Sequence, residues 1–159
     1  MAEYPRLLHT VLDTTTPRQL AEFYRELLGL QYRPGDEPAG RADRGEGADA
    51  GDGGEGEDGG EGADGGDDPD WLVLVDSTGA RQLAFQLVDQ LTPTTWPTHD
   101  VPMQAHVDFT VSSRDELERH RGRAEALGAG HLLDRTDDPD APLYVLADPS
   151  GHPFCLFVA

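Results

Sequence analysis

The order of apolar and polar residues in the first half of the chain predicts a strand, a helix and two further strands. Residues 7–13 form a short β-prone run. Apolar side chains then recur at helical spacing over residues 17–28, and Gly29 provides a residue that commonly ends a helix. Two more strands are predicted over residues 71–76 and 82–88, joined by a short polar turn.

The second half shows a similar order of elements. A strand over residues 105–111 leads to Ser113, which can cap a helix, and Glu116 stands at the spacing of a capping box. This helix is expected to stop at Gly128. Three strands follow, over residues 131–135, 143–147 and 154–158.

The two halves can be aligned residue by residue. His9 matches His106, and Leu20 and Leu117 each follow their histidine by eleven residues. This correspondence indicates an internal duplication of a β-α-β-β-β module. We expect one domain, residues 1–159, with module one over residues 6–90 and module two over residues 103–159.

An acidic segment of low complexity interrupts module one. Residues 36–70 hold fourteen of the 31 acidic residues and twelve of the 19 glycines, with no aromatic residue and no Ile, Leu or Val. Such a segment cannot bury enough apolar surface to offset the entropy lost on ordering its backbone. We expect a disordered acidic loop, which serves either as an expanded surface loop or as a docking and solubility segment.

The formal charge of −19 limits the classes of partner. A phosphate backbone requires a clustered basic surface, so nucleic acid is not expected as a partner. The chain has no apolar run of about 18 residues, so no membrane span is predicted, and its start does not read as a secretory signal. The single Cys155 permits no internal disulfide. We expect a cytoplasmic protein with a small-molecule partner, and a homodimer is the assembly we consider.

Four predicted strands each place one polar or soft side chain on the face opposite to their apolar neighbours. These residues are His9, Gln86, His106 and Cys155. Asp108 shares the face of His106, because side chains alternate along a strand. Two modules of this kind can curl their sheets into one open cup. We expect these five side chains to line a ligand site in the cup, with Trp96 near its rim.

Several segments together carry a family resemblance. RLLHTVLD followed by AEFYRELLGL resembles the opening of the vicinal-oxygen-chelate superfamily, which includes glyoxalase I, extradiol dioxygenases and bleomycin-binding proteins. LAFQLV, the connector from Thr92 to Pro97, QAHVDFTV and LADPSGHPFCLF resemble its glyoxalase-like domain subgroup. The resemblance covers nearly the whole chain except the acidic insertion. It implies an α+β fold in which two βαβββ modules form a cup-shaped mixed sheet.

The resemblance also implies a set of metal ligands. Metal enzymes of the superfamily take one ligand from each of four strands, and the matching positions are His9, Gln86, His106 and Cys155. Glyoxalase I has carboxylates at the second and last of these positions. Hard cations prefer anionic oxygen, so this set disfavours Ni²⁺ or Mg²⁺, whereas a thiolate with two histidines suits Zn²⁺. Asp108 is a candidate general base, and alternatively a hydrogen-bond partner that orients His106.

Two functions of different classes remain open. One is a metal-dependent lyase, isomerase or dioxygenase acting on a small oxygenated substrate, though not a true glyoxalase I, because Cys155 cannot act as the base while it coordinates a metal. The other is a metal-free protein that sequesters a small apolar or aromatic molecule of antibiotic type, with Cys155 as a small buried apolar side chain. Four other histidines are expected at the surface: His99, His120, His131 and His152.

Overall fold

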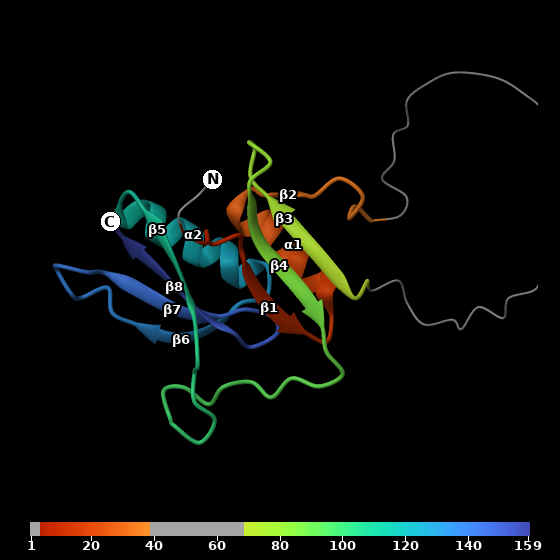
Figure 1. The fold of residues 1–159 in the computed structure, drawn as a ribbon. Helices are drawn as coiled ribbons and strands as arrows, with labels where there is room; N and C mark the ends of the chain where they lie inside the picture. The colour runs from red at the N-terminus through yellow and green to blue at the C-terminus, as the bar shows by residue number, and fades with distance from the viewer. Residues whose placement is uncertain (1–3, 39–68) are drawn as a thin grey trace, which may run out of the picture.

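The computed structural model describes residues 4–38 and 69–159, and within them the predicted duplication is visible. The first half contains β1 (Thr10–Thr14), α1 (Pro17–Leu28), β2 (Gln31–Tyr32), β3 (Trp71–Val75) and β4 (Arg81–Leu87). The second half contains β5 (Val107–Val111), α2 (Arg114–Ala126), β6 (Gly130–Asp134), β7 (Leu143–Ala147) and β8 (Pro153–Val158). Both halves therefore run β-α-β-β-β (Figure 1).

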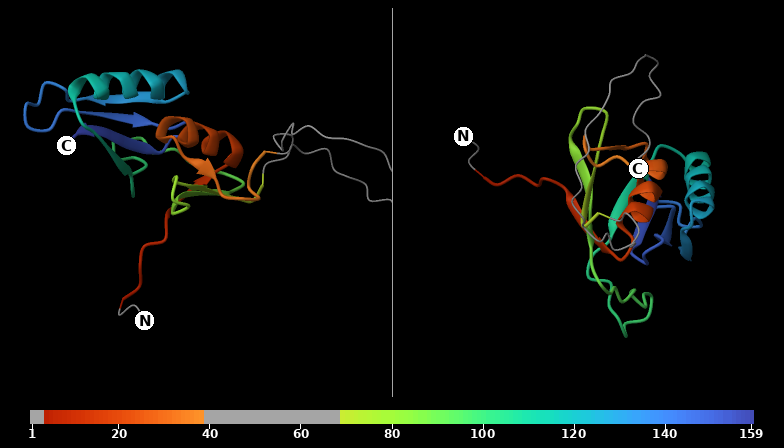
Figure 2. Two further views of the ribbon diagram at one scale, coloured as in Figure 1. Left: turned by 90° about the horizontal axis from the view of Figure 1, so that it is seen from above. Right: turned by 90° about the vertical axis from the view of Figure 1, so that its right-hand side faces the viewer.

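Each half forms one four-stranded mixed sheet with the same strand order. The orders are β1-β4-β3-β2 and β5-β8-β7-β6. In both sheets the first strand of the half pairs in parallel with the last, and the other neighbours are antiparallel. The predicted α+β class with paired βαβββ modules is confirmed. The two helices lie on the same side of the sheets (Figure 2), and within residues 4–38 and 69–159 no helix covers the opposite sheet faces.

Helix α1 forms where the helical spacing predicts it. Pro17 occupies the first helical turn, where its missing N–H has no helical partner to lose. Gly29 adopts φ 69° and ends the helix, with the cap N–H donating to the carbonyl oxygen of Arg25. One face of the helix is buried, with Leu20, Ala21, Phe23, Tyr24 and Leu27.

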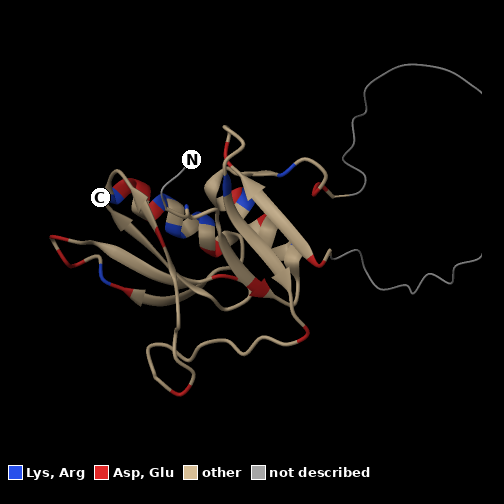
Figure 3. Cartoon of the chain, viewed as in Figure 1, with Lys and Arg blue, Asp and Glu red and all other residues tan. Residues whose placement is uncertain are grey.

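Helix α2 is more polar and relies on its cap. Ser113 Oγ accepts the Glu116 N–H at 3.2 Å, as predicted. In a capping box the Glu116 carboxylate would in turn accept the Ser113 N–H. Here it accepts from the N–H and the hydroxyl of Ser112 instead. Arginine and glutamate side chains form ion pairs along both helices, and Figure 3 shows the basic and acidic positions interspersed on them. Neither helix in the described part of the chain is long and apolar enough to cross a membrane.

An aromatic cluster joins the two halves. Tyr24 of α1 is fully buried and stacks on Phe85 of β4, with ring centroids 5.9 Å apart. The same ring contacts Phe109 of β5 and Phe154 of β8, each at 6.2 Å. Phe23 also contacts Phe154, at 6.0 Å. Helix α1 therefore belongs to the first half in sequence but supplies core contacts to both sheets.

Three details differ from the sequence expectation. The first strand begins at Thr10, the first residue paired with β4, and Leu7 before it is 89% exposed. The second strand of module one is the two-residue β2, too short to show a period. Asp36 lies in the range expected to be disordered, yet its carboxylate accepts the Val73 N–H at 2.9 Å and pairs with Arg33. The rest of that expectation, for residues 39–68, falls outside the described residues.

The turn between β7 and β8 approaches the connector that joins β4 to β5. Gly151 has φ +92°, and a Cβ atom there would lie 2.9 Å from the Cβ atom of Pro93. Because both the backbone conformation and this contact disfavour a side chain, Gly151→Ala should lower the free energy of unfolding by about 2–4 kcal/mol. Urea denaturation measures this change. Gly122→Ala is the control, since a Cβ atom there meets nothing within 4 Å and alanine favours a helix. Equal losses in the two variants would contradict the explanation.

Candidate functional site

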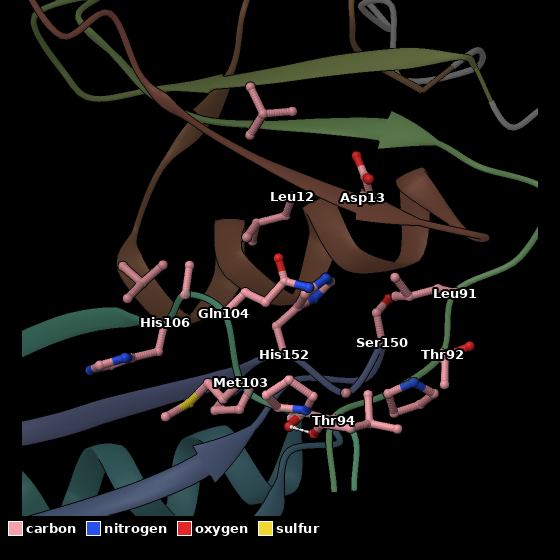
Figure 4. Close-up of a pocket in the computed structure, with 18 of the residues that line it drawn as sticks. Leu12, Asp13, Leu91, Thr92, Thr94, Met103, Gln104, His106, Ser150 and His152 are labelled. Atoms are coloured by element: carbon pink, nitrogen blue, oxygen red, sulfur yellow. Dashed lines mark hydrogen bonds between the residues drawn. The ribbon is translucent and has the colours of Figure 1, made fainter. Parts of the chain in front are cut away.

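A pocket of about 660 Å³ lies where the two halves meet (Figure 4), a volume typical of small-molecule sites. Its walls come from β1, the end of β4, the connector over residues 88–106, the start of β5 and the β7–β8 turn. The apolar part of the lining includes Val11, Leu91, Val101, Met103 and Pro153. The polar side chains with ionisable or amide groups are Asp13, Gln86, Gln104, His106 and His152.

Strand alternation directs two of these polar residues to the pocket. Asp13 and Gln86 are direct neighbours across the parallel β1–β4 pair. They share a sheet face with Val11, while Phe85 lies on the other face and packs in the core. Both polar residues are exposed, and Val11 is 42% exposed. This sheet face is therefore open to a ligand.

Three potential metal ligands converge on the second sheet. His106 Nε2 lies 3.3 Å from Asp108 Oδ1, and Asp108 is the direct cross-strand neighbour of Cys155. One ligand atom from each residue lies within 4.8 Å of the other two. Donor atoms around one zinc ion lie about 3–4 Å apart. The three ligand atoms would therefore have to move only slightly closer together to bind one zinc ion. The His106–Asp108–Cys155 cluster is thus a candidate metal group.

The thiol of this cluster is held in its protonated form. Burial raises the pKa of Cys155 to about 11, and Asp108 contributes both by hydrogen bonding to the thiol and by repelling a thiolate. A metal ion that binds the sulfur must therefore displace this proton. Without a metal, the side chain behaves as a weakly polar group.

Alkylation of Cys155 tests this environment. Because the thiolate is the reacting form, metal-stripped protein at pH 8 should react with iodoacetamide roughly 100-fold more slowly than an unperturbed thiol. Asp108→Asn removes the repelling charge, so the pKa should fall and the reaction should accelerate. Asp13→Asn, on the other sheet, is the control and should leave the rate unchanged. A fast reaction in the unmodified protein would contradict the assignment.

His9 occupies a different environment from His106. Its ring contacts Trp71 at 6.0 Å between centroids, and its Nδ1 atom is buried with no hydrogen-bond partner among the described residues. It borders a second hollow, of about 560 Å³, that Asp108 also lines. His9 does not belong to the cluster of His106, Asp108 and Cys155.

The strand registers place Gln86 and Cys155 at positions that are not equivalent in the two halves. Asp108 pairs with Cys155 on β5 and β8, and the position equivalent to Asp108 in the first half, Val11, pairs with Ala84. Ala84 is therefore the counterpart of Cys155, and Gln86 lies two residues further along β4. A shared site for His9, Gln86, His106 and Cys155 stays a prediction. Of these four residues, only His106 and Cys155 belong to one cluster, in which Asp108 lies between them.

His152 is a pocket residue that sequence reasoning placed at the surface. Its side chain is 22% exposed and lines the pocket from the β7–β8 turn (Figure 4). The expectation is corrected, because the turn faces β1 and the connector and not bulk solvent. The available signal was the sequence Asp-Pro-Ser-Gly-His, which puts an imidazole four residues after a carboxylate in a tight turn.

Trp96 lies in the connector that forms one wall of the pocket. The residue is partly buried, and its backbone N–H donates to Thr94 Oγ1 at 3.1 Å. Residues on both sides of it in sequence line the pocket, over 91–94 and 101–105. Its own place at the rim stays a prediction.

The fold and the pocket define a class of protein in which two βαβββ modules enclose a cavity. A family model described as a glyoxalase-like domain matches residues 9–157, and the chain therefore belongs to the glyoxalase-like domain family. The resemblance seen in the sequence segments is thus confirmed. No curated protein matches the chain in sequence.

Solved structures share this fold at low sequence identity. A glyoxalase/bleomycin resistance protein/dioxygenase family enzyme from Burkholderia phytofirmans PsJN is 13% identical, with a TM-score of 0.62 and coverage of 97% of this chain and 98% of that one. The fosfomycin resistance protein FosX from Listeria monocytogenes is 13% identical, with a TM-score of 0.60 and coverage of 98% and 94%. Lactoylglutathione lyase from Agrobacterium tumefaciens is 14% identical, with a TM-score of 0.54 and coverage of 99% and 96%. These similarities show the fold alone.

Proposed function

We propose that the chain binds a small uncharged or cationic molecule with an apolar body in the pocket between the two halves. The observation that carries this proposal is the lining, in which aliphatic, proline and methionine side chains surround a few hydrogen-bonding groups. The apolar walls favour burial of the ligand body. Gln86, Gln104 and the histidines supply the polar contacts that orient it.

The charge of the pocket favours such a ligand over an anion. Asp13 is the carboxylate in the lining, and the described lining contains no arginine. The whole chain carries a formal charge of −19, which repels anions at longer range as well. Fosfomycin and lactoylglutathione, after which two of the structurally similar proteins are named, are both anionic. We therefore propose a ligand of a different charge class.

Three small aromatic probes with matched shapes test this proposal. Benzylamine, benzyl alcohol and benzoate have one ring each and differ in charge. Titrated by NMR, benzylamine and benzyl alcohol should shift the amide signals of Gln86 and His106, with benzoate the weakest binder. Asp13→Asn should remove the preference for the amine, and Asp89→Asn, outside the pocket lining, is the matched control. Absence of shifts at the pocket would overturn the binding function, and tighter binding of benzoate would overturn the charge preference.

Glyoxalase I activity is expected to be absent. The glyoxalase I reaction uses a carboxylate of its metal site as the base, and the family resemblance implies Gln86 and Cys155 at the two carboxylate positions. The protein supplied with methylglyoxal, glutathione and Ni²⁺ or Zn²⁺ should therefore show no turnover in the usual enzymatic range of roughly 1–10³ s⁻¹. Formation of the thioester, followed by its absorbance, would contradict this expectation.

A second candidate function is a metal-dependent enzyme, and the His106–Asp108–Cys155 cluster is the observation that favours it. These side chains would hold Zn²⁺, which as a Lewis acid polarises a bound substrate oxygen. Metal analysis of protein purified without an affinity tag discriminates between the two functions. Zinc at one equivalent, lost in Cys155→Ser and retained in Ser112→Ala, would support the enzyme. A protein that contains no metal and does not take up zinc would exclude the metal-dependent enzyme and favour the binding function.

A further inference from the structure

The β7–β8 turn contains a buried carboxylate that receives four hydrogen bonds. Asp148 is 4% exposed. Its Oδ1 atom accepts from the backbone N–H groups of Ser150 and His152 at 2.9 and 3.0 Å. Its Oδ2 atom accepts from the buried Tyr24 hydroxyl at 2.9 Å and lies 3.0 Å from His152 Nδ1. The carboxylate thus connects the core of α1 to an imidazole in the pocket.

The internal duplication shows which parts of this arrangement the turn itself requires. The β3–β4 turn has the same backbone bonds, from the Asp76 N–H to the Ala80 oxygen and from the Gly79 N–H to the Asp76 oxygen. Asp76 Oδ1 also accepts two backbone N–H groups there, and Gly79 has a positive φ like Gly151. The position of His152 is occupied by Ala80. An aspartate and a glycine therefore suffice for the turn, and neither the imidazole nor a buried tyrosine partner is needed to build it.

The hydrogen bonds of Asp148 determine which nitrogen of His152 bears the proton in the neutral ring. A carboxylate oxygen offers only lone pairs, so the Nδ1 atom facing it must be the donor. The Nε2 atom then has a free lone pair. It has no hydrogen-bond partner among the described residues and is not among the buried unsatisfied atoms, so it is accessible. The ring comes from the turn and lines the pocket (Figure 4).

We propose that His152 is a general base for a ligand held in this pocket and that Asp148 is its positioning residue. In the proposed step the proton of an acidic X–H bond of the ligand moves to Nε2, and the bonding electron pair stays on the ligand. The carboxylate of Asp148, 3.0 Å from Nδ1, stabilises the imidazolium that forms. The reverse transfer returns the proton to the product. This role rests on the proposed small-molecule binding, and it adds a chemical activity to it.

The tautomer of His152 gives a test that needs no ligand. Nitrogen-15 NMR of histidine-labelled protein, recorded where the imidazole is neutral, should show a protonated Nδ1 and a lone pair on Nε2. Asp148→Asn can present its amide N–H to Nδ1, so the opposite tautomer should appear. His99, an exposed residue of the connector, should be unaffected by this substitution. A protonated Nε2 in the unmodified protein would overturn the proposal.

A kinetic probe tests the base itself. The neutral aromatic molecule 5-nitrobenzisoxazole loses its ring C–H proton to a base while its N–O bond breaks, giving a coloured cyanophenolate. The protein should accelerate this elimination with saturation, and His152→Gln should lower the rate at least about 100-fold. Asp148→Asn should lower it as well, whereas His99→Gln should leave it unchanged.

The outcomes separate the base from the binding function. A rate equal to that of the unmodified protein in His152→Gln would overturn the proposal. A rate that never saturates with substrate would overturn binding in the pocket. The tautomer measurement alone then decides whether Asp148 positions His152 as proposed. If Asp148→Asn does not fold, the tautomer of the unmodified protein and the rate of His152→Gln still decide the outcome.

Discussion

Phe154→Ala should lower the free energy of unfolding by about 3–5 kcal/mol, the usual cost of truncating a buried phenylalanine. Phe154 is fully buried on β8 and contacts the rings of Phe23, Tyr24 and Phe109. The cavity would open where α1 packs against the second sheet, so the contact between the two halves weakens together with the core. Urea denaturation followed by circular dichroism measures the change.

Phe157→Ala is the matched control on the same strand. Phe157 is partly buried and lies on the opposite face of β8, two residues from Cys155. Its truncation should cost clearly less than that of Phe154. Equal losses would mean that the aromatic cluster on the helix side does not hold the two halves together.

Asp148→Ala should lower the free energy of unfolding by about 3–5 kcal/mol as well. The substitution leaves the Tyr24 hydroxyl and the backbone N–H groups of Ser150 and His152 without their acceptor. A buried donor that loses its partner costs about 1–3 kcal/mol, and the tyrosine has no access to water. Thermal and urea unfolding should both show the loss.

The first half supplies the control for this substitution. Asp76 makes the corresponding turn bonds in a solvent-exposed place, so water can replace its carboxylate in Asp76→Ala. That variant should lose much less stability than Asp148→Ala. Similar losses would show that the turn geometry, and not the burial of Asp148, determines the cost.

The duplication and the helix ends could be predicted because local signals encode them. Pro17 and Gly29 bracket α1 as expected, and the Ser113 cap begins α2. The two-residue β2 escaped detection because no periodicity exists over so short a span. Its existence depends on pairing with β3, which lies on the far side of the acidic segment.

The site was harder to predict because it depends on contacts between distant segments. Alternation indicated that Gln86 faces the cup, but the register that makes Ala84 the counterpart of Cys155 depends on the pairing of β1 with β4. For His152 the sequence showed only a turn. Its place in a pocket comes from the approach of the connector and the buried contact between Tyr24 and Asp148, 124 residues apart.

The shared core has a consequence for the order in which the chain is synthesised. A ribosome makes α1 long before β5 and β8, yet the ring of Tyr24 packs against Phe109 and Phe154 and its hydroxyl bonds to Asp148. The first module therefore cannot complete its core before β5 and β8 have been made, although domains generally begin to fold from their N-terminal end. Until β8 has been made, the apolar face of α1 lacks its partners from the second half, so the two modules should acquire protease resistance together.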